Sequence, residues 1–392
     1  MKPNLSRREW IAAAAGACLA RPFESRASNA PGGIVSVAKC KSYGPELLPT
    51  LERMFDQIGG LGKLVKGKTV AIKINMTGSP TYRLGYKPLG DTHYTSPQVI
   101  GATVHLMGKA GAKCIRLLES PWNTADPLEE VMLQANWEPA VLASAAPRVE
   151  FENTNYLGPR AKTYSRFPVP KGGHMFREYV LNHSYEDCDV FVSLAKMKDH
   201  ATAGITLSMK NCFGCTPCTI YGDGSPVDEP SPTPRGGRGP FHSGNRQPAR
   251  IAPPENDPKS PREGGYRVPR VVADLVAARP IHLAIVEGVE SMAAGEGPWN
   301  RGVHPVSPGV IVVGTNPVAT DAVSMAVMGY DPMADRGTPP FETCDNTLRL
   351  AEELGAGTRD LNRIEVVGTP IQEALFSYAE LRRKRNLAAR RG

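Results

Sequence analysis

The apolar residues of the chain recur in two patterns, one typical of helices and one typical of buried strands. Between positions 46 and 58 they return every three or four residues, which predicts an amphipathic helix. Continuous apolar runs that are too short for helices predict strands at 69–74, 114–118, 190–194, 282–286, 310–313 and 364–367. Further helices are expected at 96–111, 203–210, 267–278, 316–328 and 348–354. This alternation favours an α/β fold of the Rossmann-like kind, with a mostly parallel sheet and helices on both faces.

Two segments interrupt this rhythm. Residues 135–185 are irregular apart from a predicted strand at 149–152. Residues 221–266 are rich in Pro, Gly and Ser and lack periodicity, so we expect a long surface insertion that is flexible rather than a lid. We therefore expect a single α/β domain over 31–381, with the insertion at 221–266 and a basic C-terminal tail at 382–392.

The net charge of +7 is unevenly distributed along the chain. Its excess lies in the first thirty residues and in six basic residues between positions 382 and 391, and the rest of the chain is slightly acidic. A nucleic-acid-binding protein should carry its positive charge on the folded domain, so we expect no nucleic-acid partner. No apolar run approaches the roughly 18 residues of a transmembrane helix, so no transmembrane segment is expected.

The N-terminus resembles a twin-arginine export signal. Arg7 and Arg8 are followed by Trp10 and Ile11 and then by a weakly apolar stretch rich in alanine. We therefore interpret residues 1–30 as a signal peptide, expect the twin-arginine translocase as a partner during export, and expect a periplasmic mature protein. Lipoprotein anchoring through Cys18 is a less favoured alternative. The twin-arginine pathway carries folded proteins, and many of them already hold a cofactor. The predicted signal therefore slightly favours the presence of a cofactor in this protein.

Polar residues follow several of the predicted strands. In an open parallel sheet, ligands bind outside the carboxyl ends of the strands. The residues at or soon after those ends are Asn75, Glu119, Lys196, Lys198, His200, Glu287, Glu296 and Asn316. A turn or a helix cap explains any single one of them, but together they predict a polar rim along one edge of the sheet.

Asp321 extends this set of candidates. The helix predicted around it is apolar nearly all round, so its carboxylate is expected to be buried. A buried carboxylate needs a cation, a metal or hydrogen bonds, because an unpaired one is very costly. Lys210, which lies on another mostly apolar predicted helix, is a candidate partner. A site role and a structural ion pair both remain open for Asp321.

Three cysteines, Cys212, Cys215 and Cys218, form a C-x₂-C-x₂-C array. This spacing matches the first three ligands of a bacterial ferredoxin run, but the usual fourth cysteine is absent. A fourth ligand would have to come from elsewhere in the chain, or the cluster would keep an open iron. The alternatives are a site for zinc or another divalent metal, a disulfide with one leftover thiol, or inert thiols with no cofactor.

Seven blocks of the chain resemble, in the expected order, those of domain-of-unknown-function family 362: VAIKIN at 70–75, TSP at 95–97, SLAKMKDH at 193–200, GITLSMKNCFG at 204–214, VEG at 286–288, GEGP at 295–298 and NPVATD at 316–321. The likeness covers residues 69–368. It implies no established activity, although relatives are often described as iron–sulphur proteins because some are fused to ferredoxin-type segments. This chain has no such segment, and Cys212 stands where the family block usually has Leu.

These observations leave three functions open. The first is an exported enzyme or electron carrier with a metal or iron–sulphur centre near the rim, acting with a redox partner protein. Its lysines would hold an anionic small molecule, its acids a hard cation, and His200 would transfer a proton. We assign catalytic roles to Lys196, Lys198, His200, Lys210 and Asp321, and cofactor binding to Asn75, Glu119, Glu287, Glu296 and Asn316.

The second function is a periplasmic binding or metallocofactor-delivery protein that uses the same rim without turnover. In the third, the cysteines are structural and the protein is a partner in an exported complex. The sequence also contains no GxxxxGK[ST], HExxH or GxSxG motif. This argues against P-loop nucleotide hydrolysis, zinc-dependent proteolysis of the HExxH type and α/β-hydrolase chemistry.

Overall fold

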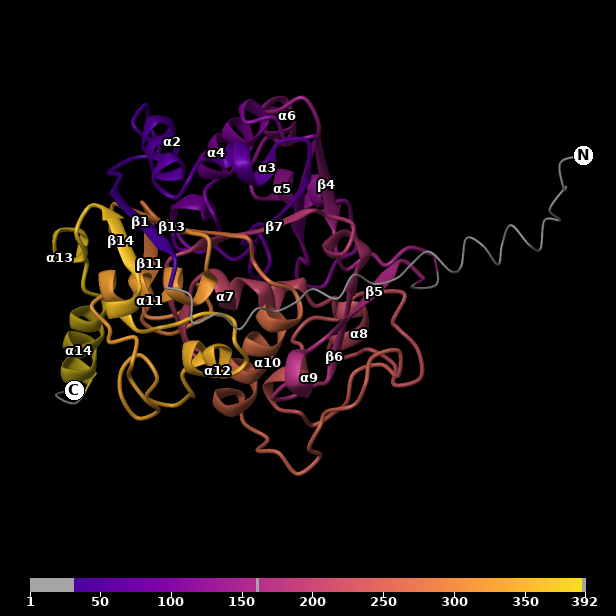
Figure 1. The fold of residues 1–392 in the computed structure, drawn as a ribbon. Helices are drawn as coiled ribbons and strands as arrows, with labels where there is room; N and C mark the ends of the chain where they lie inside the picture. The colour runs from indigo at the N-terminus through magenta and orange to yellow at the C-terminus, as the bar shows by residue number, and fades with distance from the viewer. Residues whose placement is uncertain (1–31, 160–161, 390–392) are drawn as a thin grey trace, which may run out of the picture.

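The computed structural model describes residues 32–159 and 162–389 (Figure 1). The predicted signal peptide at 1–30, including Cys18, lies outside the described residues. Within the described part of the chain, no helix is long and apolar enough to cross a membrane.

The centre of the molecule is an eight-stranded sheet with the order β14-β1-β13-β10-β7-β2-β3-β4. Its strands are β1 (Ile34–Lys39), β2 (Thr69–Lys73), β3 (Cys114–Glu119), β4 (Val149–Asn153), β7 (Val190–Lys196), β10 (Leu283–Gly288), β13 (Val310–Gly314) and β14 (Glu365–Gly368). All neighbouring strands pair in parallel except β13, which runs antiparallel to both β1 and β10. The sheet is therefore mostly parallel, as the sequence predicted.

Two hydrophobic cores lie on opposite faces of this sheet, because successive side chains of a strand point to opposite sides. In β10, Leu283 and Ile285 enter one core, whereas Ala284 and Val286 enter the other, and all of them are fully buried. Each buried Val, Leu or Ile side chain contributes roughly 1.5–3 kcal/mol. Burial on both faces explains why these strands appear in the sequence as continuous apolar runs.

Helices cover both faces (Figure 1). One face carries α2 (Leu47–Gln57), α3 (Leu61–Val65), α4 (Pro97–Lys109), α5 (Leu128–Gln134) and α6 (Pro139–Ser144). The other carries α7 (Ser208–Asn211), α10 (Gly264–Ala278), α11 (Pro317–Val327) and α12 (Thr347–Glu353). Shorter or peripheral helices are α8 (Cys218–Tyr221), α9 (Gly239–His242), α13 (Ile371–Ala374) and α14 (Tyr378–Ala389). The predicted α/β fold with helices on both faces is confirmed.

Three two-stranded hairpins surround the main sheet. They are β5–β6 (Tyr164–Pro168 and Glu178–Asn182), β8–β9 (Lys198–His200 and Gly204–Thr206) and β11–β12 (Ser291–Ala293 and His304–Val306). The hairpin β8–β9 occupies part of the segment 203–210, for which the sequence predicted a helix. That prediction was wrong for most of the segment, because Gly204 turns the chain with a φ of 77° and helix α7 begins only at Ser208.

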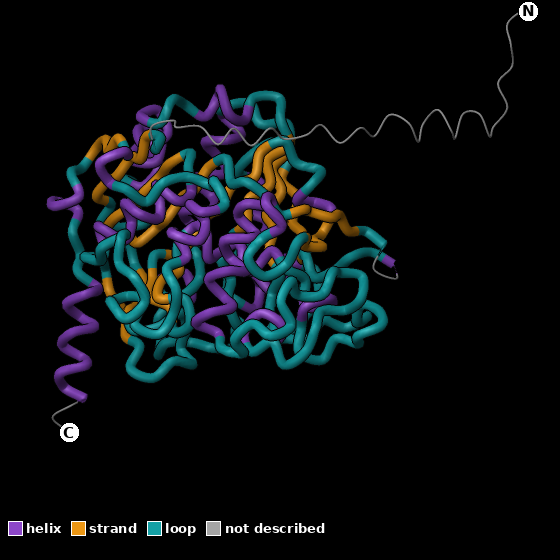
Figure 2. Tube along the Cα trace, turned by 60° about the horizontal axis from the view of Figure 1, so that its bottom comes forward, coloured by secondary structure: helices purple, strands orange, loops and turns teal. Residues whose placement is uncertain are grey.

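The insertion at 221–266 is attached to the domain by a buried ionic cluster. Glu255 pairs with Arg262 at 2.6 Å and with Arg267, at the start of α10, at 2.8 Å. The side chain of Arg267 is fully buried, and Phe241 of α9 is buried against the domain. In Figure 2 many loops, drawn in teal, lie along the lower side of the molecule, and others run across its top. The ionic cluster joins the insertion to α10. Residues of the insertion can therefore hold fixed positions around a site.

The predicted basic tail begins within α14 rather than after the last helix. Arg382 is mostly buried and pairs with Glu342 at 2.7 Å. Figure 2 shows α14 at the periphery of the molecule, next to the C-terminus. The first arginine of the tail therefore packs against the domain.

Candidate functional site

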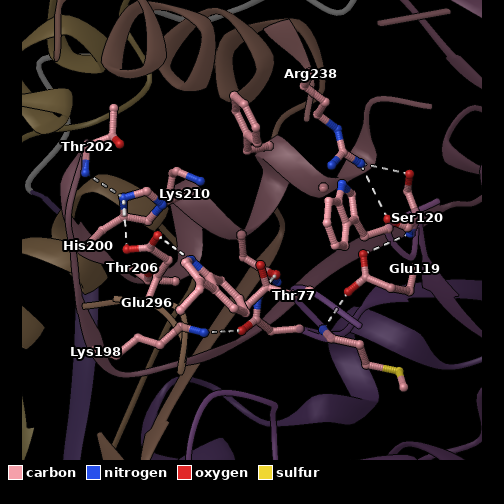
Figure 3. A pocket seen from close by; sticks show the side chains of 18 of the residues that line it. Thr77, Glu119, Ser120, Lys198, His200, Thr202, Thr206, Lys210, Arg238 and Glu296 are labelled. Carbon is pink, nitrogen blue, oxygen red and sulfur yellow. Dashed lines mark hydrogen bonds and ion pairs between the residues drawn. The ribbon is translucent and has the colours of Figure 1, made fainter. Parts of the chain in front are cut away.

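A cavity of about 340 Å³ opens beyond the carboxyl ends of β2, β3 and β7 (Figure 3). From β2 the chain proceeds outward through β3 to β4, and then returns to place β7 on the other side of β2. Such a reversal of strand order is a topological switch point, where open α/β sheets bind their ligands. Of the predicted site residues, those that line the cavity are Asn75, Glu119, Lys198, His200, Lys210 and Glu296.

A buried ion pair forms one wall. Lys73, the last residue of β2, pairs with Glu119, the last residue of β3, at 2.6 Å. The Glu119 carboxylate also accepts hydrogen bonds from the backbone N–H of Met76 at 2.7 Å and of Ser120 at 2.8 Å. With these partners the carboxylate of Glu119 is fully engaged, and its negative charge is balanced within the protein.

The hairpin β8–β9 places Lys198 and His200 on a second wall. The Nζ of Lys198 donates to Oδ1 of Asn75 at 3.0 Å and to the carbonyl of His93 at 2.5 Å. Asn75 in turn donates from Nδ2 to Oδ1 of Asn211 at 3.2 Å. Burial lowers the pKa of Lys198 well below its usual range. Lys198 therefore ties the hairpin to the end of β2.

His200 is neutral and acts as a hydrogen-bond donor toward the cavity. Its Nδ1 accepts from the backbone N–H of Thr202 at 3.0 Å and of Ala203 at 3.2 Å, which places the ring proton on Nε2. Burial lowers the pKa of His200 to about 3, although Glu296 acts in the opposite direction. The sequence suggested His200 as the proton carrier from its unperturbed pKa, but its surroundings make it a donor instead.

Glu296 is the second carboxylate of the cavity and is held from two sides. Its Oε2 accepts the backbone N–H of Ala201 at 2.9 Å, and its Oε1 accepts the indole N–H of Trp299 at 3.0 Å. Burial raises the pKa of Glu296, but the charge of His200, which is protonated at the acidic pH where Glu296 titrates, and these donors outweigh burial and lower the pKa of Glu296 to about 2. The carboxylate is therefore ionised at neutral pH, at the opposite end of the cavity from Glu119 (Figure 3).

Two cationic groups of the cavity, Lys210 Nζ and Arg238 Nη1, have neither an ion pair nor a hydrogen-bond acceptor among the described residues. Lys198 also lacks an acidic partner, but it is bonded to Asn75 and His93. The Nζ of Lys210 lies 4.2 Å from the centre of the Phe213 ring. Burial lowers the pKa of Lys210 to about 7, against the opposing effect of Glu296. Arg238 belongs to the insertion and bonds to residues outside it. Its Nε donates to Oγ1 of Thr216 and its Nη2 donates to Oγ of Ser120, both at 2.9 Å. Its Nη1 has no acceptor among the described residues, so both side chains are available to an anion.

Lys196 and Glu287 form a separate buried ion pair that does not line the cavity. Lys196 also donates to the carbonyls of Gly90 at 2.6 Å and Glu290 at 2.9 Å. Glu287 accepts the backbone N–H of Ser96 at 2.9 Å, which fixes the start of α4. Both follow strand ends as the sequence indicated, but their side chains are used within the protein.

Asn316 and Asp321 also lie away from the cavity lining. Because β13 is antiparallel, its carboxyl end and Asn316 are at the opposite edge of the sheet from the other candidates, which corrects the expectation of a common rim. There, Asn316 caps α11 by accepting the N–H of Ala319 at 2.9 Å. Asp321 accepts the backbone N–H groups of Ser208 and Met209 at 2.9 Å each, so it fixes the start of α7 and does not pair with Lys210.

The three cysteines of the array are buried behind the cavity wall rather than in its lining. Cys212 and Cys215 share the short helical turn at Cys212–Cys215, whereas Cys218 begins α8. Among residues 32–159 and 162–389, no group of three or more His, Cys, Asp or Glu side chains is placed to hold a metal ion. The thiols therefore do not form a ready ligand set in this arrangement.

Several cavity residues were not identified from the sequence: Lys73, Tyr82, Trp122, Asn211, Arg238 and Trp299. Lys73 lies at a strand end already marked by Asn75, so the same rule could have found it, as it indicated Ser120 next to Glu119. The two tryptophans are among only four in the chain and follow polar strand ends or glycine-rich turns. Nothing in the irregular sequence around Arg238 distinguishes it from its neighbours.

The fold and the cavity define an α/β protein with a cavity lined by basic side chains at the switch point of its sheet. The chain belongs to the family described as "Domain of unknown function (DUF362)", which matches residues 70–326. This confirms the resemblance found in the sequence blocks. A thylakoid-associated protein of Synechocystis sp. is 29% identical over 185 residues, covering 47% of this chain and 50% of that protein. The chain thus spans about half the length of this curated relative.

Two solved structures show distant likeness. A protein from Thermotoga maritima aligns with 13% identity and a TM-score of 0.36, over 81% of this chain and 59% of that one. The lactate racemase apoprotein from Thermoanaerobacterium thermosaccharolyticum aligns with 10% identity and a TM-score of 0.32, over 70% and 54% of the two chains.

Proposed function

We propose that the cavity binds a small organic anion and that Lys210 exchanges a proton with it. The observation that carries this proposal is the presence at one cavity of two cationic groups, Lys210 Nζ and Arg238 Nη1, that have neither an acidic partner nor a hydrogen-bond acceptor among the described residues. Both side chains are partly buried, so their charges are partly removed from water, and an anionic ligand would supply the missing partner. The charge of Arg238 lowers the pKa of Lys210, so the two side chains interact electrostatically within the same cavity.

The balance of charge in the lining favours an anion over a cation. Four cationic side chains, Lys73, Lys198, Lys210 and Arg238, face two carboxylates, Glu119 and Glu296. The two carboxylates already accept hydrogen bonds from N–H groups of the protein. Few of their lone pairs are therefore left for a divalent cation, which would need about six oxygen ligands.

Lys210 is the side chain best suited to move a proton. With a pKa of about 7, its amine and ammonium forms are both populated at neutral pH. The ammonium form of Lys210 pairs with the carboxylate of the anion beside Arg238. In the fraction of bound protein that carries the amine form, the amine of Lys210 takes a proton from a carbon next to a carbonyl of the anion. The electron pair of the broken C–H bond passes to the carbonyl oxygen, to which Nε2–H of His200 donates a hydrogen bond. Arg238 keeps the carboxylate in place.

Hydrogen exchange tests this step. Small carboxylates with an acidic C–H, such as pyruvate and malonate, would be incubated with the protein in D₂O and followed by proton NMR. We expect exchange above the rate without protein, and its loss in Lys210→Met. Binding of these anions without faster exchange would contradict proton transfer and would support the alternative, a binding or delivery protein that uses the same cavity without turnover.

The redox role expected from the cysteine array has weaker support. The three thiols are buried, and no group of three or more His, Cys, Asp or Glu side chains among the described residues is placed to hold a metal ion, so we derive no reaction step through a cluster. Export through the twin-arginine pathway rests on residues outside the described part of the chain. Neither idea is needed for the anion site, which depends only on the described cavity residues.

A further inference from the structure

Three aromatic side chains, Tyr82, Trp122 and Trp299, lie at the cavity. The ring centre of Tyr82 is 6.1 Å from that of Trp122 and 5.7 Å from that of Trp299. Tyr82 is 40% exposed and Trp299 is 43% exposed, so part of their apolar surface faces solvent. Large aromatic side chains with exposed surface at a cavity are typical of places where a ligand completes the burial.

Glycine residues make room for both tryptophan rings. A Cβ atom at Gly236, in the insertion, would overlap the indole of Trp122. A Cβ atom at Gly78 or Gly297 would overlap the indole of Trp299. Gly78 also has a φ of 78°, which side chains other than glycine rarely adopt. The backbone of three separate loops is therefore shaped around the positions of these rings.

The aromatic group and the unpaired cations belong to the same cavity. Arg238 lies two residues after Gly236, so one turn of the insertion contacts Trp122 and also supplies a cation. Trp299 bonds to Glu296, whose charge acts on Lys210. A ligand that reaches Lys210 and Arg238 from solvent can therefore contact aromatic surface along its length.

We infer that the ligand is an aromatic carboxylate, whose planar ring packs against Tyr82, Trp122 and Trp299 while its carboxylate binds Lys210 and Arg238. This inference rests on the proposed anion site and adds the class of molecule. Lys210 and Arg238 Nη1 offer one cationic donor each, which matches the two oxygens of a carboxylate. A cavity of about 340 Å³ lies within the range that holds small organic ligands.

Calorimetric titration with three matched probes tests this inference: 2-naphthoate, decahydro-2-naphthoate and 2-naphthamide. The first pair differs only in the planar ring, and 2-naphthamide lacks only the charge of 2-naphthoate. We expect wild type to bind 2-naphthoate about 2- to 10-fold more tightly than the saturated acid, because aromatic pairs add to area burial by this much. 2-Naphthamide should bind most weakly.

Variants then locate the preference. Trp122→Leu and Trp299→Leu should each lose the preference for 2-naphthoate over the saturated acid, whatever contact area both acids lose with the indole. Tyr86→Leu is the matched control, because Tyr86 is fully exposed and does not line the cavity. Circular dichroism confirms that each variant is folded. Trp299→Leu also removes the hydrogen bond to Glu296. Trp122→Leu leaves that bond in place, so it tests the aromatic contact separately.

The outcomes separate the two proposals. Equal affinity of wild type for the two acids, or an unchanged preference in both tryptophan variants, would overturn the aromatic carboxylate while leaving the anion site intact. Binding of 2-naphthamide as tight as that of 2-naphthoate would overturn the anion site itself. If none of the three probes binds but pyruvate or malonate does, the aromatic carboxylate is overturned and the anion site stands. If none of these anions binds, both proposals are contradicted.

Discussion

The indole N–H of Trp299 donates to Oε1 of Glu296 at 3.0 Å, which joins the aromatic part of the cavity to its ionised part. The other oxygen of Glu296 lies 3.7 Å from Nδ1 of His200. Glu296 also raises the pKa of Lys210, in opposition to burial. A single carboxylate thus positions an aromatic ring and sets the charge state of the proposed proton carrier.

Replacement of Glu296 by Gln should lower the pKa of Lys210 below about 7, because burial then acts without the opposing negative charge. Anion binding that requires the ammonium form should consequently lose affinity at a lower pH than in wild type. Titration of 2-naphthoate binding between pH 5 and 9 measures this midpoint. A midpoint that stays in place or moves to higher pH would show that Glu296 does not act on the binding group.

Loss of the Glu255 charge should destabilise the protein strongly. In Glu255→Gln the fully buried guanidinium of Arg267 loses its ionic partner, and breaking such a buried pair costs about 3–5 kcal/mol. Asp228→Asn is the control, since Asp228 pairs with Arg250 at the exposed surface, where a pair contributes about 0–1 kcal/mol. Urea unfolding followed by circular dichroism compares the two. Similar free energies of unfolding in both variants would argue against a buried anchor for the insertion.

Asp321 should make the stability of the protein depend on pH in a specific direction. Burial raises the pKa of Asp321 from its ordinary value of 3.8 to about 7, so the folded state binds this proton more tightly than the unfolded state. Its contribution is therefore fully present below about pH 4 and is lost as the pH rises through about 7. Asp321→Asn removes this titration but keeps an oxygen that can accept hydrogen bonds from Ser208 and Met209.

The free energy of unfolding of wild type, measured relative to Asp321→Asn, should accordingly fall between pH 4 and pH 7. Urea denaturation at several pH values gives this difference. A difference that rises with pH would mean that the carboxylate is stabilised in its ionised form, and that the hydrogen bonds from the start of α7 outweigh burial.

Iron, zinc and sulphide analysis of anaerobically purified protein tests the cysteine array. Because no group of three or more His, Cys, Asp or Glu side chains among the described residues is placed to hold a metal ion, we expect the same metal content in wild type and in Cys215→Ser. Stoichiometric iron and sulphide that disappear in Cys215→Ser would instead establish an iron–sulphur centre. Such a result would require the segment around Cys218 to rearrange when the cluster binds.

The rim residues that the sequence located correctly are those on parallel strands. The apolar runs before Asn75, Glu119 and Lys198 are continuous because both faces of these strands are buried, so their ends were visible in the pattern. The run before Asn316 has the same appearance, but β13 is antiparallel. Strand direction depends on tertiary connections that a short apolar run does not encode, which is why Asn316 was placed at the wrong edge.

Other features of the site depend on contacts that are distant in sequence. Arg238 lies in a segment without periodicity, and its position follows from hydrogen bonds to Ser120 and Thr216. The charge state of His200 could not be inferred either, because it is set by burial and by the turn of the hairpin β8–β9. Lys210 was identified, but its availability for a ligand became clear only when Asp321 was found bonded to Ser208 and Met209.

The most direct test of the anion site is the pH dependence of 2-naphthoate binding to wild type, Lys210→Met and the control Lys63→Met, in which an exposed lysine of α3 is replaced. The affinity of wild type and of the control should fall about tenfold or more as the pH rises through about 7, because a hydrogen bond from a charged donor is then lost. Lys210→Met should bind weakly at every pH and show no such step. If Lys210→Met binds 2-naphthoate with the affinity and pH dependence of wild type, Lys210 does not hold the anion and the proposed function is wrong.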